Sequence, residues 1–558
     1  MTSSRRPCDR SVFLVPALPT VPHNTTAGAS AGRGHRTRPS VGHNWRRCAV
    51  ECNVRTVHSM SRVLLAMAAG LCAPTIACGR AGEPAGAPAS TSTGPATDSG
   101  GVLTHDSGTD ASTTSASITD GGTDATTCAT ETTIDGFVYD PAGVNPLWNV
   151  TVFVPDPSSP LPDLDTIPLS CGCGALFPSA VIAYGVTDAT GHFVIHNAPS
   201  GTLSLVAQAG KWRMQFDNET IANCTSTTVS PLRLPRNSSE GSLPNVAIST
   251  GGADSLECLP LRMGVSASEY VAGSADGGHL HIYTGFNGAS TTPASPQSYQ
   301  ALWDSQDDLN SHDLVLLSCE GLETTGGNPG VAMTIGYQTE LMTYANAGGR
   351  VLASHYHYVF FSSGPFDTAP DTLATWQGSN ANPEIVVAGD LDAASAVVDT
   401  TLDDGAAFPQ GAVLQQWLGM VGALTNEELR LWFARDNVVA LNAPPSVEWM
   451  HLVDNTGTVT APAQAFSVDT PIDASATGTC GRVIYTDLHG GGGPGVSEPG
   501  VTPDYPDAGI QGGIVPTQCA SRPLTPQESA MEFMIFDLSS CLVAPGSAAA
   551  IEQPTLAP

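Results

Sequence analysis

The segment from His312 to Tyr358 constrains the fold of this 558-residue chain more than any other, because it has the pattern of strand, helix and strand. Its first part, 313–319, is a short apolar run rich in Leu and Val, typical of a strand buried on both faces of a parallel sheet. Residues 335–346 have apolar side chains at helical spacing before a Gly pair, and 351–354 is the next strand. The segment therefore predicts a βαβ unit that ends in the sequence Ser-His-Tyr-His at the carboxyl edge of the sheet.

The formal net charge of −31 is distributed unevenly along the chain. Residues 1–59 contain nine arginines and only two acidic residues, so the remainder carries roughly −38. An acidic body of this kind repels phosphates, and we therefore expect no nucleic-acid partner. Because few residues are charged and Gly, Pro, Ser and Thr are abundant, the composition favours an exported, β-rich protein.

The N-terminal region predicts export. Residues 1–59 lack hydrophobic periodicity, so we interpret them as a mis-assigned extension upstream of Met60. Residues 60–78 resemble a bacterial lipoprotein signal peptide, with an apolar core behind one Arg and a small residue before Cys78, whose thiol would carry the lipid. An ordinary secretory signal cleaved nearby is the alternative. Residues 79–127 contain no core-forming pattern, which predicts a disordered low-complexity linker.

Residues 128–250 alternate apolar and polar positions as short, half-buried strands do. They contain G-x-V-x-D from Gly136, P-L-x-x-V-x-V from Pro146, T-D-x-x-G-x-F from Thr187 and P-x-G from Pro199. In this order the motifs resemble the carboxypeptidase regulatory-like domain, a small transthyretin-like β-sandwich. The resemblance implies a folding or adhesion module without catalytic activity.

Residues 255–545 are predicted to form a second, α/β domain around the central βαβ unit. Thr525, Pro526 and Glu528 are typical of a helix start, and Thr425 with Glu428 has the pattern of a capping box. Residues 546–558 are expected to be a disordered tail. Further strands are expected at 279–284, 385–388 and 481–488, and further helices at 411–424, at 427–433 and after Thr525.

Three parts of this domain resemble the class I glutamine-amidotransferase-like family, in particular its trehalose-utilisation-protein-like branch. They are D-L-V-L-L at 313–317, Y-x-x-A-G-G-R-V-L-A-S-H at 344–355 and G-R-V-I-Y-T at 481–486. The resemblance implies a multidomain protein with a small all-β sandwich followed by an α/β, flavodoxin-like parallel-sheet domain. The layout also resembles uncharacterised lipoproteins of myxobacterial type. In the amidotransferase-like family a nucleophilic Cys follows the strand after the Gly pair, whereas Ser354 and His355 occupy that place here. Amidotransferase activity is therefore not expected. Whether the chain is an enzyme at all is left open, and a non-catalytic role is favoured.

Two histidine-bearing clusters are expected to meet at the carboxyl edge of the sheet. One contains His355 and His357, and the other contains Asp487 and His489. Residues two apart in extended chain project to the same side, so the four side chains form a candidate site for a divalent metal such as zinc. A metal-free ligand crevice and purely structural histidines are the alternatives. In the crevice interpretation Ser354, Tyr356 and Tyr485 would line the ligand site.

Nine cysteines follow Cys78, and in an exported protein they predict disulfides. The odd number leaves one unpaired within the chain, and Cys319 is the candidate for a buried free thiol because it ends an apolar strand. Pairing among Cys480, Cys519 and Cys541 is expected, with zinc binding by Cys171 and Cys173 as an alternative use of two others.

These features predict a lipoprotein anchored through Cys78 at the outer membrane or cell surface. The expected role is binding or envelope architecture, with a carbohydrate or another surface protein as the partner. A metal-dependent hydrolase using the His/Asp clusters is the alternative.

Overall fold

The structure, a computed structural model, describes residues 128–557 except 292–296, 322–333, 369–371, 377–393, 436, 454–461, 473, 475–477, 492–497, 499, 506–509, 511 and 548–552. All described residues belong to one compact unit, Ser117–Pro558. The extension at 1–59, the signal peptide with Cys78, the linker and the strand expected at 385–388 lie outside the described residues.

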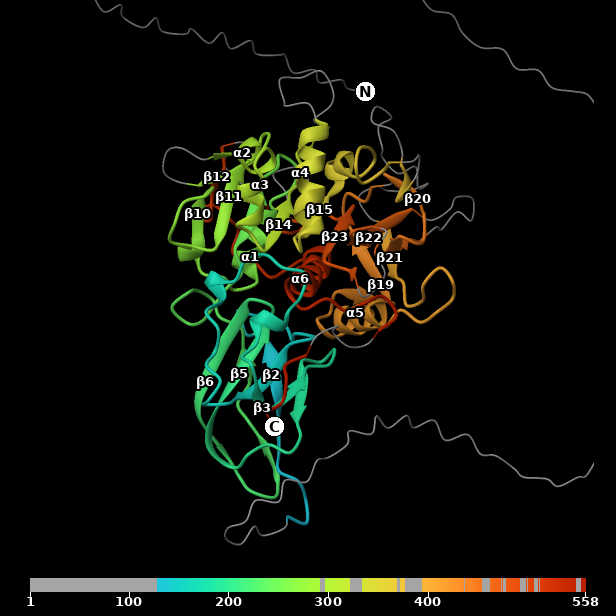
Figure 1. Ribbon diagram of the computed structural model, residues 1–558. Helices are drawn as coiled ribbons and strands as arrows, with labels where there is room; N and C mark the ends of the chain where they lie inside the picture. Colours follow the sequence, from blue (N-terminus) through green and yellow to red (C-terminus); the bar gives the residue numbers. More distant parts are fainter. Residues whose placement is uncertain are drawn as a thin grey trace, which may run out of the picture. The chain divides into compact units, whose positions relative to one another are not determined.

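The first part of the described chain is built from two sheets, with strand orders β4-β1-β7 (β8 also pairs with β1) and β3-β2-β5-β6 (Figure 1). Apolar residues of both sheets, such as Val138 and Val152, are fully buried in one core. In β1, buried residues alternate with more exposed ones, because successive side chains of a strand point to opposite faces. The strands are β1 (Thr133–Tyr139), β2 (Thr151–Pro155), β3 (Val181–Val186), β4 (His192–Ile195), β5 (Gly201–Ala209), β6 (Trp212–Ile221), β7 (Ser226–Thr228) and β8 (Leu232–Arg233).

The second part is organised around a large mixed sheet with the order β10-β11-β9-β14-β15-β23-β22-β21-β17-β19-β18. Strands β11, β9, β14, β15 and β23 pair parallel with one another in this order. Strand β22 pairs antiparallel with β23, and the remaining strands, β21, β17, β19 and β18, also pair antiparallel. The strands on the sheet's main path are β9 (Val246–Ser249), β10 (Tyr270–Ala272), β11 (Leu280–Thr284), β14 (Leu314–Leu317), β15 (Arg350–Ser354), β17 (Ala394–Val398), β18 (Leu424–Thr425), β19 (Glu428–Leu431), β21 (Ser446–Leu452), β22 (Ala463–Thr470) and β23 (Gly481–Thr486). The others are β12 (Ser290–Thr291), β13 (Gln297–Ser298), β16 (Ala374–Trp376), β20 (Val438–Leu441) and β24 (Ile514–Val515).

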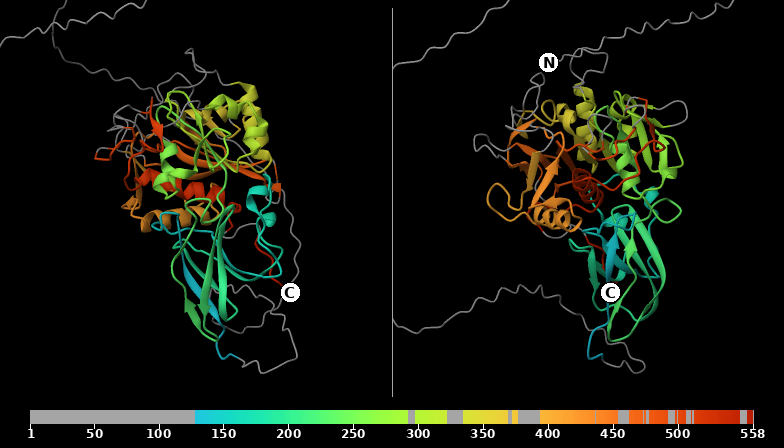
Figure 2. Two further views of the ribbon diagram at one scale, coloured as in Figure 1. Left: turned by 90° about the vertical axis from the view of Figure 1, so that its left-hand side faces the viewer. Right: turned by 180° about the vertical axis from the view of Figure 1, so that it is seen from behind.

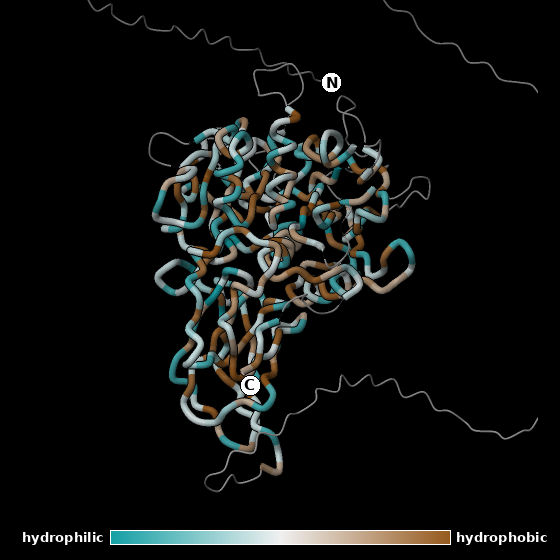
Figure 3. Tube along the Cα trace, viewed as in Figure 1, coloured by the Kyte–Doolittle hydropathy of each residue, from teal (hydrophilic) through white to brown (hydrophobic). Residues whose placement is uncertain are grey.

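Helices cover both faces of the parallel strands (Figure 2). In β14, Leu314 and Leu316 pack in the core that contains α6, whereas Val315 and Leu317 pack in the core that contains α4. Burial on both faces explains why this strand is a continuous apolar run, and hydrophobic residues accordingly concentrate inside the fold (Figure 3). The helices are α1 (Leu259–Arg262), α2 (Tyr299–Trp303), α3 (Gln306–Asn310), α4 (Ile335–Asn346), α5 (Pro409–Met420) and α6 (Pro526–Ser539).

The central βαβ prediction is confirmed, since β14, α4 and β15 occupy the expected residues. The final helix is confirmed as well: the Thr525 hydroxyl accepts a hydrogen bond from Glu528 N, and Glu528 completes the capping box. Residues 427–433, in contrast, do not form a helix. Leu424–Thr425 and Glu428–Leu431 pair as a β-hairpin, so the predicted capping box at Thr425 and Glu428 is wrong.

Two predicted boundaries also need correction. Val246–Ser249, assigned from sequence to the β-sandwich, is strand β9 of the parallel sheet, between β11 and β14. The second domain therefore begins before residue 255. The tail expected to be disordered contains residues that pair with the first part of the chain, because Val181 N donates to Thr555 O and Ala557 N donates to Val181 O.

Four disulfides link the described cysteines: Cys128–Cys224, Cys171–Cys480, Cys173–Cys541 and Cys258–Cys519. Cys319 is free and buried, as predicted. The expected pairing among the last three cysteines is wrong, since each bonds to a partner more than 250 residues away. Cys171 and Cys173 are both in disulfides, so they do not form a zinc site.

Candidate functional site

Four neighbouring parallel strands place polar side chains just beyond their carboxyl ends. Asp254 follows β9, Cys319 follows β14, His355 follows β15 and His489 follows β23. Open α/β sheets bind ligands at this edge, beside the strand where the order reverses. Here that strand is β9, which lies between β11 and β14.

The thiol of Cys319 and the imidazole of His355 are in contact. Cys319 Sγ lies 3.2 Å from His355 Nδ1, and both residues are almost completely buried. His355 has a φ of +38°, a left-handed backbone conformation that costs free energy for a residue with a Cβ. This conformation ends β15 sharply and leads into the 3-10 helix at His355–Phe360. The second ring nitrogen of His355, Nε2, is buried without a hydrogen-bond partner among the described residues.

Asp254 orients the second histidine. His489 Nδ1 lies 2.6 Å from Asp254 Oδ1, and the buried Nε2 of His489 has no described hydrogen-bond partner. The other carboxylate oxygen, Oδ2, accepts hydrogen bonds from Cys319 N at 3.1 Å and from the Ser354 hydroxyl. The backbone before Asp254 lies close to the backbone of Cys319. Gly251 allows this close packing, because a Cβ there would lie 2.1 Å from the carbonyl oxygen of Cys319.

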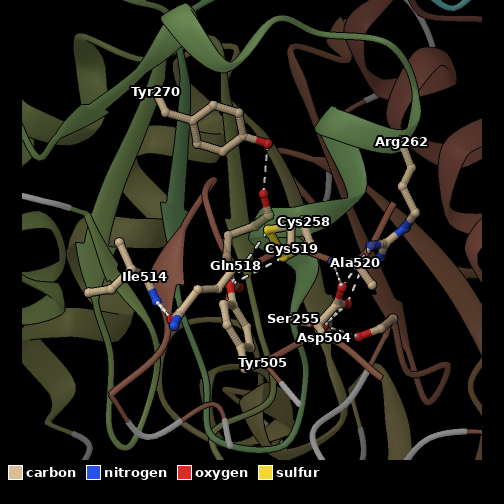
Figure 4. The surroundings of a disulfide bond; sticks show 12 residues. Ser255, Cys258, Arg262, Tyr270, Asp504, Tyr505, Ile514, Gln518, Cys519 and Ala520 are labelled. Carbon is tan, nitrogen blue, oxygen red and sulfur yellow. Dashed lines mark hydrogen bonds and ion pairs between the residues drawn. A yellow bond between two sulfur atoms is a disulfide. The ribbon is translucent and has the colours of Figure 1, made fainter. Parts of the chain in front are cut away.

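A disulfide anchors the segment that follows Asp254 (Figure 4). Cys258 bonds to Cys519, and its Sγ lies 3.2 Å from the Tyr505 hydroxyl. The Ser255 hydroxyl donates to Asp504 Oδ2 at 2.6 Å, and Arg262 donates to Asp504 Oδ1 at 3.1 Å. The carboxylate of Asp254 is therefore held on a tightly bonded segment.

Cys319, His355 and His489 lie close enough together that they could hold a metal ion. One donor atom from each lies within 4.8 Å of the other two. Burial raises the pKa of the Cys319 thiol well above its ordinary value, and the charge of Asp254 raises it further. Burial also lowers the pKa of His355 well below its ordinary value, with additional effects from His489 and Arg435. The pair is therefore a neutral thiol and a neutral imidazole.

The structure groups His355 and His489 as expected but does not place His357 and Asp487 with them. His357 Nε2 lies 2.8 Å from Ser318 O, and burial lowers the pKa of its imidazole to about 4. Asp487 Oδ1 accepts a hydrogen bond from the Tyr485 hydroxyl at 2.7 Å. Among the described residues, the structure therefore groups Cys319, rather than His357 or Asp487, with the two histidines.

The residues predicted to line a ligand crevice instead contact Cys319 or His355. Ser354 is fully buried, and its hydroxyl accepts a hydrogen bond from Cys319 N at 2.8 Å. The buried Tyr485 hydroxyl lies 2.8 Å from the carbonyl oxygen of His355 and shares its single proton between this oxygen and Asp487 Oδ1, so it helps to hold the strained residue in place. The half-buried Tyr356 ring lies against the His355 ring, with centroids 4.1 Å apart.

The sequence pattern did not indicate Asp254 or the role of Cys319. The only signal for Asp254 was its place a few residues after the apolar run at 246–249. That run was assigned to the β-sandwich, so its end was not recognised as a sheet edge. Cys319 was recognised as a buried thiol, but sequence alone does not show which neighbour it faces.

A second group, Asp399, Glu448 and His451, also has donor atoms within 4.8 Å of one another. Its members are only partly buried, and His451 Nδ1 pairs with Asp399 Oδ2 at 3.0 Å. Partly exposed acidic groups often gather without a metal, so the buried group containing Cys319 is the stronger candidate.

Comparison with known proteins adds little. No family model and no curated protein matches the chain. Two solved structures are similar over part of it: N-terminal and C-terminal interface mutants of a type II cohesin–X-dockerin complex from Acetivibrio cellulolyticus. Each is 13% identical and covers 27% of this chain and 88% of its own, with TM-scores of 0.14 and 0.12. Scores this low support no inference about fold or function.

The described residues include no helix that is long and apolar enough to cross a membrane. The four disulfides are consistent with an extracellular protein.

Proposed function

We propose that this protein is a metal-dependent hydrolase with a mononuclear centre held by Cys319, His355 and His489. The observation that carries the proposal is the convergence of these three donors at the carboxyl edge of the parallel strands. The Asp254–His489 contact adds to it, because metal-binding histidines commonly donate their other ring N–H to a carboxylate.

The donor set suits zinc. One thiolate and two neutral imidazoles are the ligands that Zn²⁺ prefers, and the low pKa of His355 keeps its imidazole available. Tetrahedral coordination would separate a ligating S and N by about 3.6 Å. The Cys319 Sγ–His355 Nδ1 distance of 3.2 Å requires an opening of only a few tenths of an ångström. Metal binding would also release the proton of the Cys319 thiol, whereas burial without a metal keeps that proton on the sulfur.

Three protein ligands leave a fourth position, as in catalytic zinc sites. A metal held by these three residues would lower the pKa of a water bound at the fourth position and would polarise a carbonyl or phosphoryl oxygen. Asp254 would keep Nε2 of His489 aimed at the centre, and Tyr485 would hold His355 in its strained conformation. We therefore expect hydrolysis of an ester, amide or phosphoester.

The decisive experiment is elemental analysis of the full chain purified without chelator or affinity tag. We expect close to one zinc, manganese or iron per chain. A Cys319→Ser, His489→Ala double variant should lose this metal, and screening of ester, amide and phosphoester substrates would follow. His196→Ala is the matched control, because this exposed histidine pairs only with Glu131 among the described residues.

His357→Ala separates the two possible ligand sets. The ring of His357 bonds to Ser318 O, so this variant should retain the metal. Loss of metal in His357→Ala together with retention in Cys319→Ser would restore the set expected from sequence. A wild-type chain that binds no metal, even after incubation with added ions, would overturn the proposal.

The second candidate is a non-catalytic role in binding a carbohydrate or another surface protein. It is favoured by the burial of Cys319 and His355, whose side chains offer almost no surface to a substrate. A chain that keeps its metal but hydrolyses none of the screened substrates, and that binds a glycan or a surface protein, would support this role.

We further propose that the second part of the chain is an α/β domain of flavodoxin-like, amidotransferase-like type behind a carboxypeptidase regulatory-like sandwich. The parallel order β11-β9-β14-β15-β23 supports this, since it corresponds to strand order 2-1-3-4-5.

We also propose an outer-membrane or cell-surface lipoprotein anchored through Cys78. Failure of a labelled fatty acid to attach to the wild-type chain, in a strain that labels its other lipoproteins, would exclude this anchor.

A further inference from the structure

A cavity of about 60 Å³ lies between the first and second parts of the described chain. One wall is formed by residues of the segment 168–176 and by Lys211, and the other by the starts of β14 and β15 and by the end of α6. The carboxyl ends of the same two strands lead to Cys319 and His355, so the cavity lies at the opposite edge of the sheet from the candidate metal centre. A single water needs about 15 Å³ by this measure, so the cavity can hold a small polar group.

The wall formed by the segment 168–176 is fixed in place by close packing and by covalent bonds. Ser170 packs against Gly348, where a Cβ would collide with the carbonyl oxygen of the serine. Cys171 and Cys173, in the same segment, both form disulfides with the second part of the chain. The cavity is therefore formed before a ligand arrives, and binding needs little further ordering of the chain.

Arg350, the first residue of β15, brings a buried cation to the cavity. It is 9% exposed and lines the cavity on the face of the sheet that α6 covers, since Leu352, two residues further along the strand, packs in the core that contains α6. Among the described residues its guanidinium donates one hydrogen bond, from Nη1 to Cys480 O at 2.7 Å. A guanidinium has five N–H donors, so most of those of Arg350 have no partner in the described part of the chain. Buried donors without partners cost free energy, which is recovered when a ligand completes them.

No described carboxylate forms an ion pair with Arg350. The carboxylates of Asp469 and Asp537 influence it electrostatically, but each forms its ion pair with Arg482, at 2.6 and 3.3 Å. Burial and the charge of Arg482 lower the pKa of Arg350 to about 10, so its guanidinium stays charged at neutral pH. Arg350 is thus a buried cation without a counter-ion of its own among the described residues.

Lys211 is the only lysine in the sequence, and it supplies the second cation of the cavity. Its Nζ lies 2.8 Å from Asp313 Oδ1 and donates to Ile167 O, also at 2.8 Å. An ammonium has three donors, so one remains without a partner among the described residues. The side chains of Lys211 and Asp313 are 12% and 19% exposed, which gives a ligand access from solvent. The charged residues that line the cavity, Lys211, Arg350 and Asp313, together balance one negative charge.

We infer that this cavity binds a carboxylate group with a single negative charge, between Arg350 and Lys211. The guanidinium fork can donate two hydrogen bonds to the carboxylate oxygens, and the remaining donor of Lys211 can supply a third. A phosphate dianion fits less well, because its second charge would lie close to Asp313. The ligand is therefore a small carboxylic acid, or the carboxylate of a larger molecule that extends into solvent. This site goes beyond the proposed hydrolase and does not depend on its metal.

Labelling of the single lysine tests the inference, because modification of Lys211 reports on the cavity alone. The chelator-treated full chain is titrated with acetate at constant ionic strength and reacted with an amine-reactive ester, and peptide mass spectrometry gives the rate at Lys211. By mass action this rate should fall about tenfold at an acetate concentration ten times its Kd. Arg350→Met should raise that Kd by about tenfold or more, because a charge-assisted contact is lost. Arg233→Met is the matched control, since Arg233 pairs with Glu240, and it should leave the Kd unchanged.

Absence of saturable protection by acetate would overturn the inference, as would equal Kd values in the wild type and in Arg350→Met. Stronger protection by phosphate at the same ionic strength would overturn the assignment to a carboxylate. If Arg350→Met does not fold, Arg350→Lys replaces it and should still bind acetate more weakly, because the planar fork is lost. If Lys211 does not react with the ester, thermal unfolding decides. Acetate should then raise the Tm of the wild type more than that of the Arg350 variant, and an equal rise in both contradicts the inference.

Discussion

At the scale of single residues, the candidate site depends on one strained backbone position. His355 adopts a φ of +38°, and its side chain faces the thiol of Cys319 rather than solvent. Residues with a Cβ hold such conformations only where the surroundings over-determine them. Here the Tyr485 hydroxyl at the carbonyl oxygen of His355 and the thiol at its ring provide those constraints.

The carboxylate of Asp254 should control metal affinity through His489. Asp254→Asn keeps the shape of the side chain but removes the charge that orients Nδ1 of the histidine. We expect the zinc affinity to fall by about 10- to 100-fold, the range found for such outer contacts. Competition with a chelating dye measures this change. Asp399→Asn disturbs the other Asp–His pair, at His451, and should leave the affinity unaltered. An unchanged affinity in Asp254→Asn would show that His489 is not oriented by this contact.

At the scale of elements, the β18–β19 hairpin shows how local geometry replaced the expected helix. Leu424 pairs with Leu429 and Thr425 pairs with Glu428, which leaves a two-residue turn. Both turn residues, Asn426 and Glu427, have positive φ values of 55° and 67°. Two positive φ values are typical of a type I′ turn, whose twist matches that of paired strands. Asn is well suited to this conformation, and Glu is not.

Replacing the exposed Glu427 with Gly should therefore stabilise the protein. Glycine adopts positive φ without the steric cost of a Cβ, so we expect Glu427→Gly to raise the free energy of unfolding by about 1 kcal/mol. Chemical denaturation followed by circular dichroism measures the gain. Glu427→Ala removes the same charge but keeps the Cβ, and it should give no comparable increase. A similar gain in both variants would attribute the effect to charge instead of conformation.

At the scale of the whole molecule, the first and second parts of the described chain are joined by covalent and packing contacts. Cys171–Cys480 and Cys173–Cys541 connect them, and Trp417 Nε1 donates to Pro146 O at 2.6 Å. A pair of buried carboxyls also meets across this boundary, Asp140 after β1 and Glu532 on α6. Asn145 donates to Glu532 at 2.6 Å, but no described basic residue neutralises the pair.

This carboxyl pair should make stability depend on pH. Burial raises the pKa of Asp140 to about 6, and burial together with the charge of Asp140 raises that of Glu532 well above its ordinary value. Both groups bind protons more tightly when folded, so their stabilisation is fully present below about pH 4 and is lost as the pH rises through 6. Glu532→Gln should therefore add about 1–2 kcal/mol to the free energy of unfolding at pH 8 and little at pH 4.

Urea denaturation of the wild type and Glu532→Gln at the two pH values measures this difference. The amide can still accept the hydrogen bond from Asn145, so the variant tests charge with little change in packing. An identical loss of stability between pH 4 and pH 8 in both proteins would contradict the prediction.

The sequence by itself determined the elements whose local signals agree with their surroundings. The apolar run of β14, the Gly pair after α4 and the capping box of α6 were predictable, because each depends on residues close together in the chain. The buried thiol of Cys319 was predictable for the same reason. Export was likewise predicted from composition and cysteine number, and the disulfides are consistent with it.

Only the tertiary structure decided which of these residues meet. Asp254, Cys319, His355 and His489 come from the ends of four strands, and their contacts depend on the order β9-β14-β15-β23. Disulfide partners more than 250 residues apart, and the carboxyl pair of Asp140 and Glu532, depend on the same packing. No local pattern encodes such distances, because loop closure over hundreds of residues leaves many pairings open until the sheet and its two cores form.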